Sequence, residues 1–272
     1  QGMQDKFVAL LELLRPERRN ELITLNLNPE ILEDMVFRNH KADVTDSEGN
    51  FIFQGKITNV LQVPNSVESL EFDKTLQEYI RKGYAAGEAQ GRVGRAIGFV
   101  MTVYRKLASS SAAAIHQALC NRLQRLKENA ETNSSWMNEE LDERYFGENE
   151  ELYADSSSPD EFFAGELELL ETLIDEAAEL KATDQKIRLF LNHVIKQILD
   201  ANPKEKVLIF TEYRTTQQFL KEKLVEKYGA DKVALINGSM PHNERSEAIR
   251  QFEEDGQFLI STEAGGEGIN LQ

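Results

Sequence analysis

The chain has 272 residues, of which 40% are hydrophobic, and a formal net charge of −16. This length and apolar content suffice for one large or two modest domains with hydrophobic cores, and no uninterrupted apolar stretch reaches the roughly 18 residues that a membrane helix needs. The single cysteine, Cys120, excludes an intrachain disulfide and is typical of a reducing compartment. We therefore expect a cytoplasmic protein without a membrane partner.

The negative charge is concentrated in one segment. Residues 139–176 hold fifteen Asp or Glu residues against one basic residue, Arg144, and so carry 14 of the 16 net negative charges. The remainder is nearly neutral, which leaves room for a local basic surface of the kind that binds nucleic acid. Residues 131–160 are acidic, serine-rich and poor in aliphatic side chains, a composition that favours a mobile loop.

The first 66 residues predict short helices and extended chain. Apolar residues between Phe7 and Leu14 recur at helical spacing, and Pro29 is placed as the first-turn proline of a second helix. Residues 51–53 and 57–63 favour short strands or extended connections.

A helical pattern runs from about Val67 to Ala130. Its apolar residues recur at a spacing that predicts three helices, with breaks in the glycine-rich run 83–98 and at the serines 109–111. Beyond the acidic loop we expect a helix over residues 162–182 and another that ends before Pro203.

From residue 201 onward, strands and helices are predicted to alternate. Three apolar runs predict strands, at residues 206–210, 233–236 and 258–261, and two segments between them predict helices, at residues 217–228 and 243–252. A Thr215-x-x-Gln218 capping box would begin the first helix, and Gly229 would end it. Buried strands joined by helices indicate an α/β fold with a doubly wound parallel sheet.

Polar segments follow all three predicted strands, at residues 211–214, 237–239 and 262–272. Because ligands of such sheets bind beyond the carboxyl ends of the strands, these segments predict a site. In the third segment, Gly266 and Gly268 would let backbone amides approach a phosphate, and Glu267 would accept from a ribose hydroxyl. The alternative is that the glycines only make a tight turn.

Two arginines are further candidates in this part of the chain. Arg245 would reach a phosphate across the sheet edge, or else pair with Glu247 or Glu253. Arg214, at the end of the first polar segment, is a candidate of the same kind.

Catalytic and metal sites are not expected in this chain. Its four histidines lack metal-like spacing. The Gly-x-x-x-x-Gly-Lys-Ser/Thr phosphate loop and the Asp-Glu-x-His carboxylate pair that would hold magnesium are both absent from the sequence. We expect the chain alone not to hydrolyse ATP.

Taken in order, three segments resemble motifs of the second RecA-like lobe of superfamily 2 helicases, in particular of the bacterial Swi/Snf type. They are KVLIFTEYR (206–214), INGSM (236–240) with the following Arg245, and FLISTEAGGEGINLQ (258–272). The resemblance implies the end of a first motor lobe and a connector at residues 1–66. It also implies a large helical insertion at 67–200 and an incomplete second RecA-like lobe at 201–272.

The resemblance also implies roles for single residues. Contacts to the DNA backbone would come from Thr211, Gly238, Ser239 and Thr262, with Arg214, Arg245 and Asn270 as possible additions. Nucleotide contacts would come from Gly266, Glu267 and Gly268. ATP and Mg would be held mainly by the first lobe, and the full protein would be a prokaryotic, nucleoid-associated ATPase that moves along double-stranded DNA.

Other interpretations remain open at this point. A strand-separating DNA helicase or an RNA helicase would share the second lobe. A non-catalytic interaction module would retain the nucleotide-site residues as relics, and a different doubly wound enzyme, such as a nucleotide-sugar transferase, would make the three motifs coincidental. The helical insertion or its acidic loop is a candidate surface for a protein complex.

Overall fold

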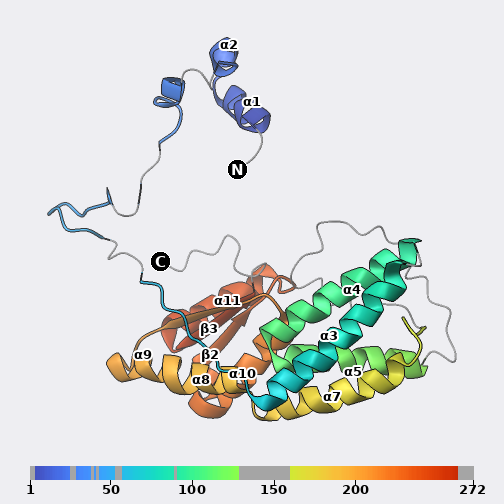
Figure 1. The fold of residues 1–272 in the computed structure, drawn as a ribbon. Coiled ribbons are helices and arrows are strands. Elements are labelled where there is room, and N and C mark those ends of the chain that lie inside the picture. Colours follow the sequence, from blue (N-terminus) through green and yellow to red (C-terminus); the bar gives the residue numbers. More distant parts are fainter. Residues whose placement is uncertain are drawn as a thin grey trace. The chain divides into compact units, whose positions relative to one another are not determined.

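The computed structural model describes residues 4–24, 29–37, 40, 43–52, 57–88, 91–128 and 160–262 (Figure 1). The chain divides into two compact units, residues 1–61 and 62–272. Of the predicted acidic loop only Asp160 belongs to the described residues, and the segment after Thr262 lies outside them.

The first unit is built from short helical pieces, namely α1 (Gln4–Leu14), η1 (Pro16–Arg18), α2 (Arg19–Leu22) and η2 (Pro29–Leu32). Leu11, Leu22 and Ile31 form its small buried core. The first predicted helix is confirmed, but the second prediction was wrong in extent, because Pro29 begins only a short 3-10 helix. An antiparallel bridge joins Thr45 to Phe51, while residues 57–63 form no strand.

The second unit begins with a helical bundle of α3 (Val67–Glu88), α4 (Gly91–Ser110), α5 (Ala112–Glu128) and α7 (Glu166–Ala182). Figure 1 shows these helices side by side. The three helices predicted before the acidic segment are confirmed, and Ser111 separates the second from the third.

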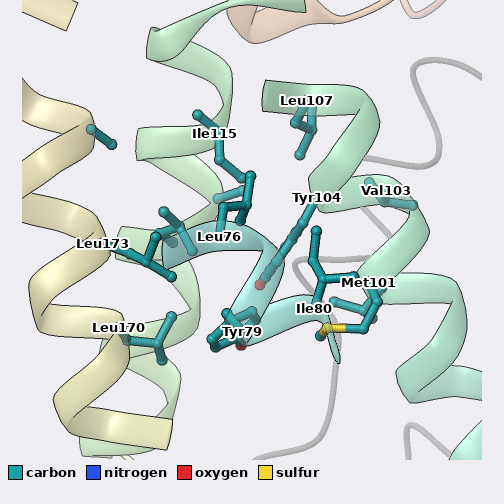
Figure 2. Close-up of a cluster of buried hydrophobic side chains, with 14 of the residues drawn as sticks. Leu76, Tyr79, Ile80, Met101, Val103, Tyr104, Leu107, Ile115, Leu170 and Leu173 are labelled. Carbon is teal, nitrogen blue, oxygen red and sulfur yellow. The ribbon is translucent and has the colours of Figure 1, made fainter. Parts of the chain in front are cut away.

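The core of the bundle follows from the helical spacing of its apolar residues. Tyr79 of α3 stacks near Tyr104 of α4 with ring centroids 6.0 Å apart, and Leu170 and Leu173 of α7 pack against the same cluster (Figure 2). Helices α3 and α4 approach closely where Gly94 faces the carbonyl of Gly87. A side chain at position 94 would overlap that oxygen.

A buried ion pair crosses the bundle. The Arg122 guanidinium on α5 donates to the Glu166 carboxylate on α7 through Nε (2.9 Å) and Nη2 (2.8 Å), and both side chains are fully buried. Glu166 also accepts from the Tyr79 hydroxyl (2.6 Å) and the Phe162 amide, while Arg122 donates to the carbonyl of Asp160 (2.8 Å). Burial raises the pKa of Tyr79 well above its ordinary value, and its neighbours Tyr104 and Glu166 add to the effect.

The bundle continues into α8 (Gln185–Leu189), the π-helix η5 (Phe190–Ile195) and α9 (Lys196–Ala201). Asp184 caps the start of this run by accepting from the amide of Ile187 at 2.9 Å. The predicted helix is therefore present and ends before Pro203, although a π-helical segment interrupts it.

Three parallel strands complete the second unit: β1 (Val207–Thr211), β2 (Val233–Ile236) and β3 (Phe258–Thr262), in the spatial order β1-β3-β2. The helix α10 (Arg214–Tyr228) joins β1 to β2, and α11 (His242–Glu254) joins β2 to β3. The predicted parallel sheet with alternating helices is thereby confirmed.

The two connecting helices cover opposite faces of the sheet. Ile209 and Ile260 point toward Phe219 and Leu220 of α10, whereas alternate residues such as Leu259 pack against α11. The chain crosses the sheet in one direction through α10 and returns through α11. Right-handed crossovers then require helices on opposite faces.

The start of α10 differs from its prediction. The helix begins at Arg214, and its N-cap residue, Tyr213, makes no capping bond with its side chain. Thr215 consequently lies inside the helix, so the predicted capping box was wrong. The helix ends as predicted at Gly229, whose φ of +98° favours glycine.

Candidate functional site

The strand register brings the ends of the three strands, where the polar segments begin, to one edge of the sheet. Thr211 and Thr262 end neighbouring strands and are direct Cα partners. Ile236 is paired with Ser261, so the Asn237–Ser239 turn leaves β2 beside the end of β3. This is the edge where parallel sheets bind ligands.

The candidate contact residues differ in accessibility. Ser239 and Arg214 are exposed, and Thr211 and Gly238 are half-buried. The side chain of Thr262 is fully buried, with 0% of its surface exposed. Ser239 is therefore the hydroxyl best placed to meet a ligand, whereas Thr262 contributes to the site through its position in the strand.

The turn after β2 is held by its own bonds and by Arg245. The Ser239 hydroxyl donates to Oδ1 of Asn237 at 2.9 Å, and the Met240 amide donates to the Asn237 carbonyl at 3.3 Å. Arg245, in the first turn of α11, donates through Nη2 to the Gly238 carbonyl (2.7 Å) and through Nε to the Met240 carbonyl (2.9 Å).

These bonds change the interpretation of Arg245. The sequence suggested either a phosphate contact or an ion pair with Glu247 or Glu253. The structure instead shows its guanidinium capping carbonyls of the turn, while Glu247 pairs with Arg250 at 2.6 Å. Arg245 thus lies at the site and shapes the backbone that surrounds it.

Gln217, on the helix α10 that covers one face of the sheet, also contacts this edge. It lies on the buried side of α10 with 2% of its surface exposed. Its Nε2 donates to the carbonyls of Ile236 and Ile260, both at 2.8 Å. Its Oε1 accepts from Nδ2 of Asn237 at 3.4 Å. One side chain therefore contacts β2, β3 and the turn.

The helical bundle reaches the turn between β1 and α10. Tyr213, in that turn, is 1% exposed and belongs to the core of the bundle. The hydroxyls of Ser110 and Ser111, at the junction of α4 and α5, each lie 2.8 Å from the Thr216 hydroxyl of α10. The bundle and the sheet edge are thus in direct contact.

The field at this edge favours an anion. Helix α10 begins after the two residues 212–213 that follow β1, and α11 begins after the short segment 237–241 that follows β2. The N-terminus of each helix, with the positive end of its dipole, therefore lies toward the carboxyl edge of the sheet. Arg214 is the first residue of α10, while Glu212 beside it places a negative charge near the same turn.

Some of the predicted site residues cannot be placed relative to this edge, because the structure does not describe them. Gly266, Glu267, Gly268 and Asn270 lie outside the described residues. Within the described ranges, no group of three or more His, Cys, Asp or Glu side chains is arranged to hold a metal ion. In the same ranges, no helix combines the length and apolar character needed to cross a membrane.

Sequence reasoning missed Gln217 as a part of the site region, and it did not predict the burial of Tyr213. A signal was present, because Tyr213, Gln217, Leu220 and Leu224 follow one another at helical spacing and share the buried face. A glutamine within such an apolar stripe has to find buried hydrogen-bond partners. Which partners it finds depends on strands that are distant in the sequence.

The parallel three-stranded sheet with helices on both faces is consistent with a RecA-like α/β fold. Residues 188–272 match the model of the helicase conserved C-terminal domain. The chain is similar to the protein named uncharacterized ATP-dependent helicase YqhH of Bacillus subtilis, with 37% identity over 101 residues, covering 36% of this chain and 18% of the relative.

A second relative is the protein named putative ATP-dependent RNA helicase MJ1505 of Methanocaldococcus jannaschii. It is 31% identical over 84 residues, covering 29% of this chain and 11% of the relative. The matches thus span less than about a fifth of either relative's length. No solved structure matches the chain.

Proposed function

We propose that this chain is part of an ATP-dependent motor of the Swi/Snf type that moves along double-stranded DNA, and that the sheet edge contacts the DNA backbone. Thr211, Gly238, Ser239 and Thr262 are the proposed contact residues, with Arg214 as a possible addition. ATP and Mg would be bound in the full protein between this lobe and a first lobe. The proposed nucleotide contacts of this chain are Gly266, Glu267 and Gly268, and Asn270 is a possible further contact to the DNA backbone.

The observation that carries the proposal is that the strand ends from which the three helicase-like segments continue lie at one edge of the sheet. Thr211 is the Cα partner of Thr262, and the Asn237–Ser239 turn follows the neighbouring strand. Two helix N-termini face the same edge, which favours the phosphates of a nucleic acid. A phosphate contact does not depend on base sequence, as a translocating motor requires.

A second candidate is an RNA helicase, because one of the relatives carries that name. Both candidates use the same lobe and predict ATP hydrolysis stimulated by a polynucleotide. They differ in the polynucleotide that stimulates and in whether strands separate. The hydrogen bonds within the chain at the sheet edge are compatible with both candidates.

The first experiment measures ATP hydrolysis by the longest protein that contains this chain, with the 272-residue chain as the control. Duplex DNA, single-stranded DNA and duplex RNA are compared as stimulators, and strand separation is followed with a labelled duplex. Stimulation by duplex DNA without strand separation supports the translocase. Stimulation by RNA with unwinding supports the second candidate, and no ATP hydrolysis by the long protein rejects both.

A matched pair of variants tests the edge itself. Ser239→Ala removes the exposed hydroxyl of the turn, whereas Ser246→Ala removes an exposed hydroxyl that bonds only within α11 in the described structure. We expect Ser239→Ala to raise the nucleic-acid concentration for half-maximal stimulation several-fold, since one hydrogen bond contributes about 0.5–1.5 kcal/mol. Equal effects of the two variants would place the contact elsewhere.

The remaining parts of the chain have proposed roles that are tested separately. The bundle of residues 67–200 would brace the motor lobes or contact DNA, and the acidic segment 131–160 would bind a partner protein. Deleting residues 131–160 should then abolish capture of that partner while leaving ATP hydrolysis unchanged. In a prokaryotic cell the motor would be associated with the nucleoid.

A further inference from the structure

The orientation of the Gln217 amide is determined by its surroundings. Its Nε2 donates to the carbonyls of Ile236 and Ile260, at 2.8 Å each. Backbone carbonyls only accept hydrogen bonds, so the NH₂ group has to face them and the oxygen has to face the other way. The flipped amide would put its oxygen against two carbonyl oxygens in a buried place, which is strongly unfavourable.

The orientation of the Gln217 amide determines the orientation of Asn237 in the turn after β2. Oε1 of Gln217 faces Nδ2 of Asn237, 3.4 Å away, so the Asn237 amide also has one favoured orientation. Its Oδ1 consequently points toward Ser239 and accepts from that hydroxyl at 2.9 Å. The exposed hydroxyl of the turn thereby takes its direction from a buried glutamine on another element.

We propose that Gln217 is a positioning residue for the phosphate contact of the β2 turn. Acting through Asn237, it holds the turn, and with it Ser239, in place at the end of β3. The proposal rests on the proposed function and names the ligand of this turn, a phosphate group of a polynucleotide backbone. Phosphate oxygens only accept, so on binding the Ser239 hydroxyl has to turn its proton from Asn237 to the phosphate; what Gln217 provides through Asn237 is the position of the turn.

The contacts that lead from Gln217 through Asn237 to Ser239 are called the relay below. A double-mutant cycle tests this relay in the longest protein that contains the chain. Gln217→Leu, Ser239→Ala and the double variant are compared by the apparent Kd for a fluorescein-labelled DNA duplex. Gln218→Leu is the matched control, because the neighbouring glutamine bonds only to Glu222 on the exposed side of α10 in the described structure. Its own single and double variants are measured in the same way.

We expect Ser239→Ala to weaken binding about three- to tenfold, in line with one hydrogen bond, and Gln217→Leu to weaken it to a similar extent. The double variant should bind no more weakly than either single variant, because both remove the same contact. Gln218→Leu should change the Kd less than about twofold and add independently. Additive effects of Gln217→Leu and Ser239→Ala would overturn the relay, since a purely structural role predicts additivity.

A second measurement separates this inference from the proposed function. Hydrogen exchange of residues 237–240 in the 272-residue chain is compared between Gln217→Leu and Gln218→Leu. Faster exchange only in Gln217→Leu supports the positioning role even where wild-type protein binds no nucleic acid, an outcome that rejects the proposed function alone. Unchanged exchange overturns the inference.

Asn237→Ala covers the case in which Gln217→Leu does not fold. It breaks the relay outside the core, since Asn237 is only half-buried. The same loss of affinity as in Ser239→Ala, again without additivity, is expected. Wild-type affinity in Asn237→Ala would overturn the relay.

Discussion

Removing the buried Arg122 should destabilise the helical bundle far more than removing an exposed charge from the same helix. Among the described residues, Arg122→Met leaves the fully buried Glu166 carboxylate with the Tyr79 hydroxyl and the Phe162 amide as its remaining donors. The hydrogen bonds lost include two to the Glu166 carboxylate and one to the Asp160 carbonyl. Breaking a buried ion pair in this way costs about 3–5 kcal/mol, a large part of the roughly 5–15 kcal/mol that stabilises a typical domain.

Urea unfolding followed by circular dichroism at the helical band measures this loss. With a slope near 2 kcal/mol per molar urea, the midpoint should fall by roughly 1.5–2.5 M. Lys127→Met is the matched control, because the Lys127–Glu171 pair at 3.0 Å joins the same two helices but has both side chains half-exposed. A surface pair of this kind contributes at most about 1 kcal/mol.

A further variant tests the cause of the effect. Replacing both Arg122 and Glu166 with methionine removes the uncompensated carboxylate, so this double variant should be more stable than Arg122→Met alone. Equal midpoints for Arg122→Met and Lys127→Met would refute the reasoning. So would a double variant that is the least stable of the set.

Three other predictions concern the second unit. Gly94→Ala should destabilise it by about 1–3 kcal/mol, because the new Cβ would overlap the Gly87 carbonyl, whereas Gly98→Ala on the same helix makes ordinary contacts and should be neutral or slightly stabilising by thermal unfolding. Thr216→Val should cost about 1–3 kcal/mol in urea unfolding, since it removes the hydroxyl that two serines share; an unchanged midpoint would show that this contact does not hold the bundle to the sheet. Burial raises the pKa of Tyr79, so its protonated hydroxyl stabilises the fold fully below about pH 10, and this stabilisation is lost as the pH rises toward the folded-state pKa. Unfolding midpoints measured from pH 9 to 11 should therefore fall less in Tyr79→Phe than in the wild type.

Local patterns predicted the elements of the second unit well. The apolar runs at β1, β2 and β3 and the helical periodicity of α3, α4 and α5 depend on neighbours within the same segment, and all of them are confirmed. The failures lie where tertiary contacts outweigh a local signal. Thr215 was predicted to cap α10, but the burial of Tyr213 in the bundle lets the helix start at Arg214.

The site divides in the same way. The position of Thr211, Ser239 and Thr262 at one edge was predictable, because parallel strands bring their carboxyl ends together and the polar segments follow them. Their accessibility was not predictable, since the burial of Thr262 depends on the elements packed around it.

By itself, the sequence determined the alternation of strands and helices, the acidity of residues 139–176 and the polar segments that follow the strands. These depend on residue type and spacing along the chain. Only the tertiary structure decided the partners of Arg122, Arg245 and Gln217, whose side chains reach Glu166, the β2 turn and two strands. The physical reason is that these buried polar groups form hydrogen bonds with atoms that are distant in the sequence. Only the folding of the chain brings those atoms within hydrogen-bond distance.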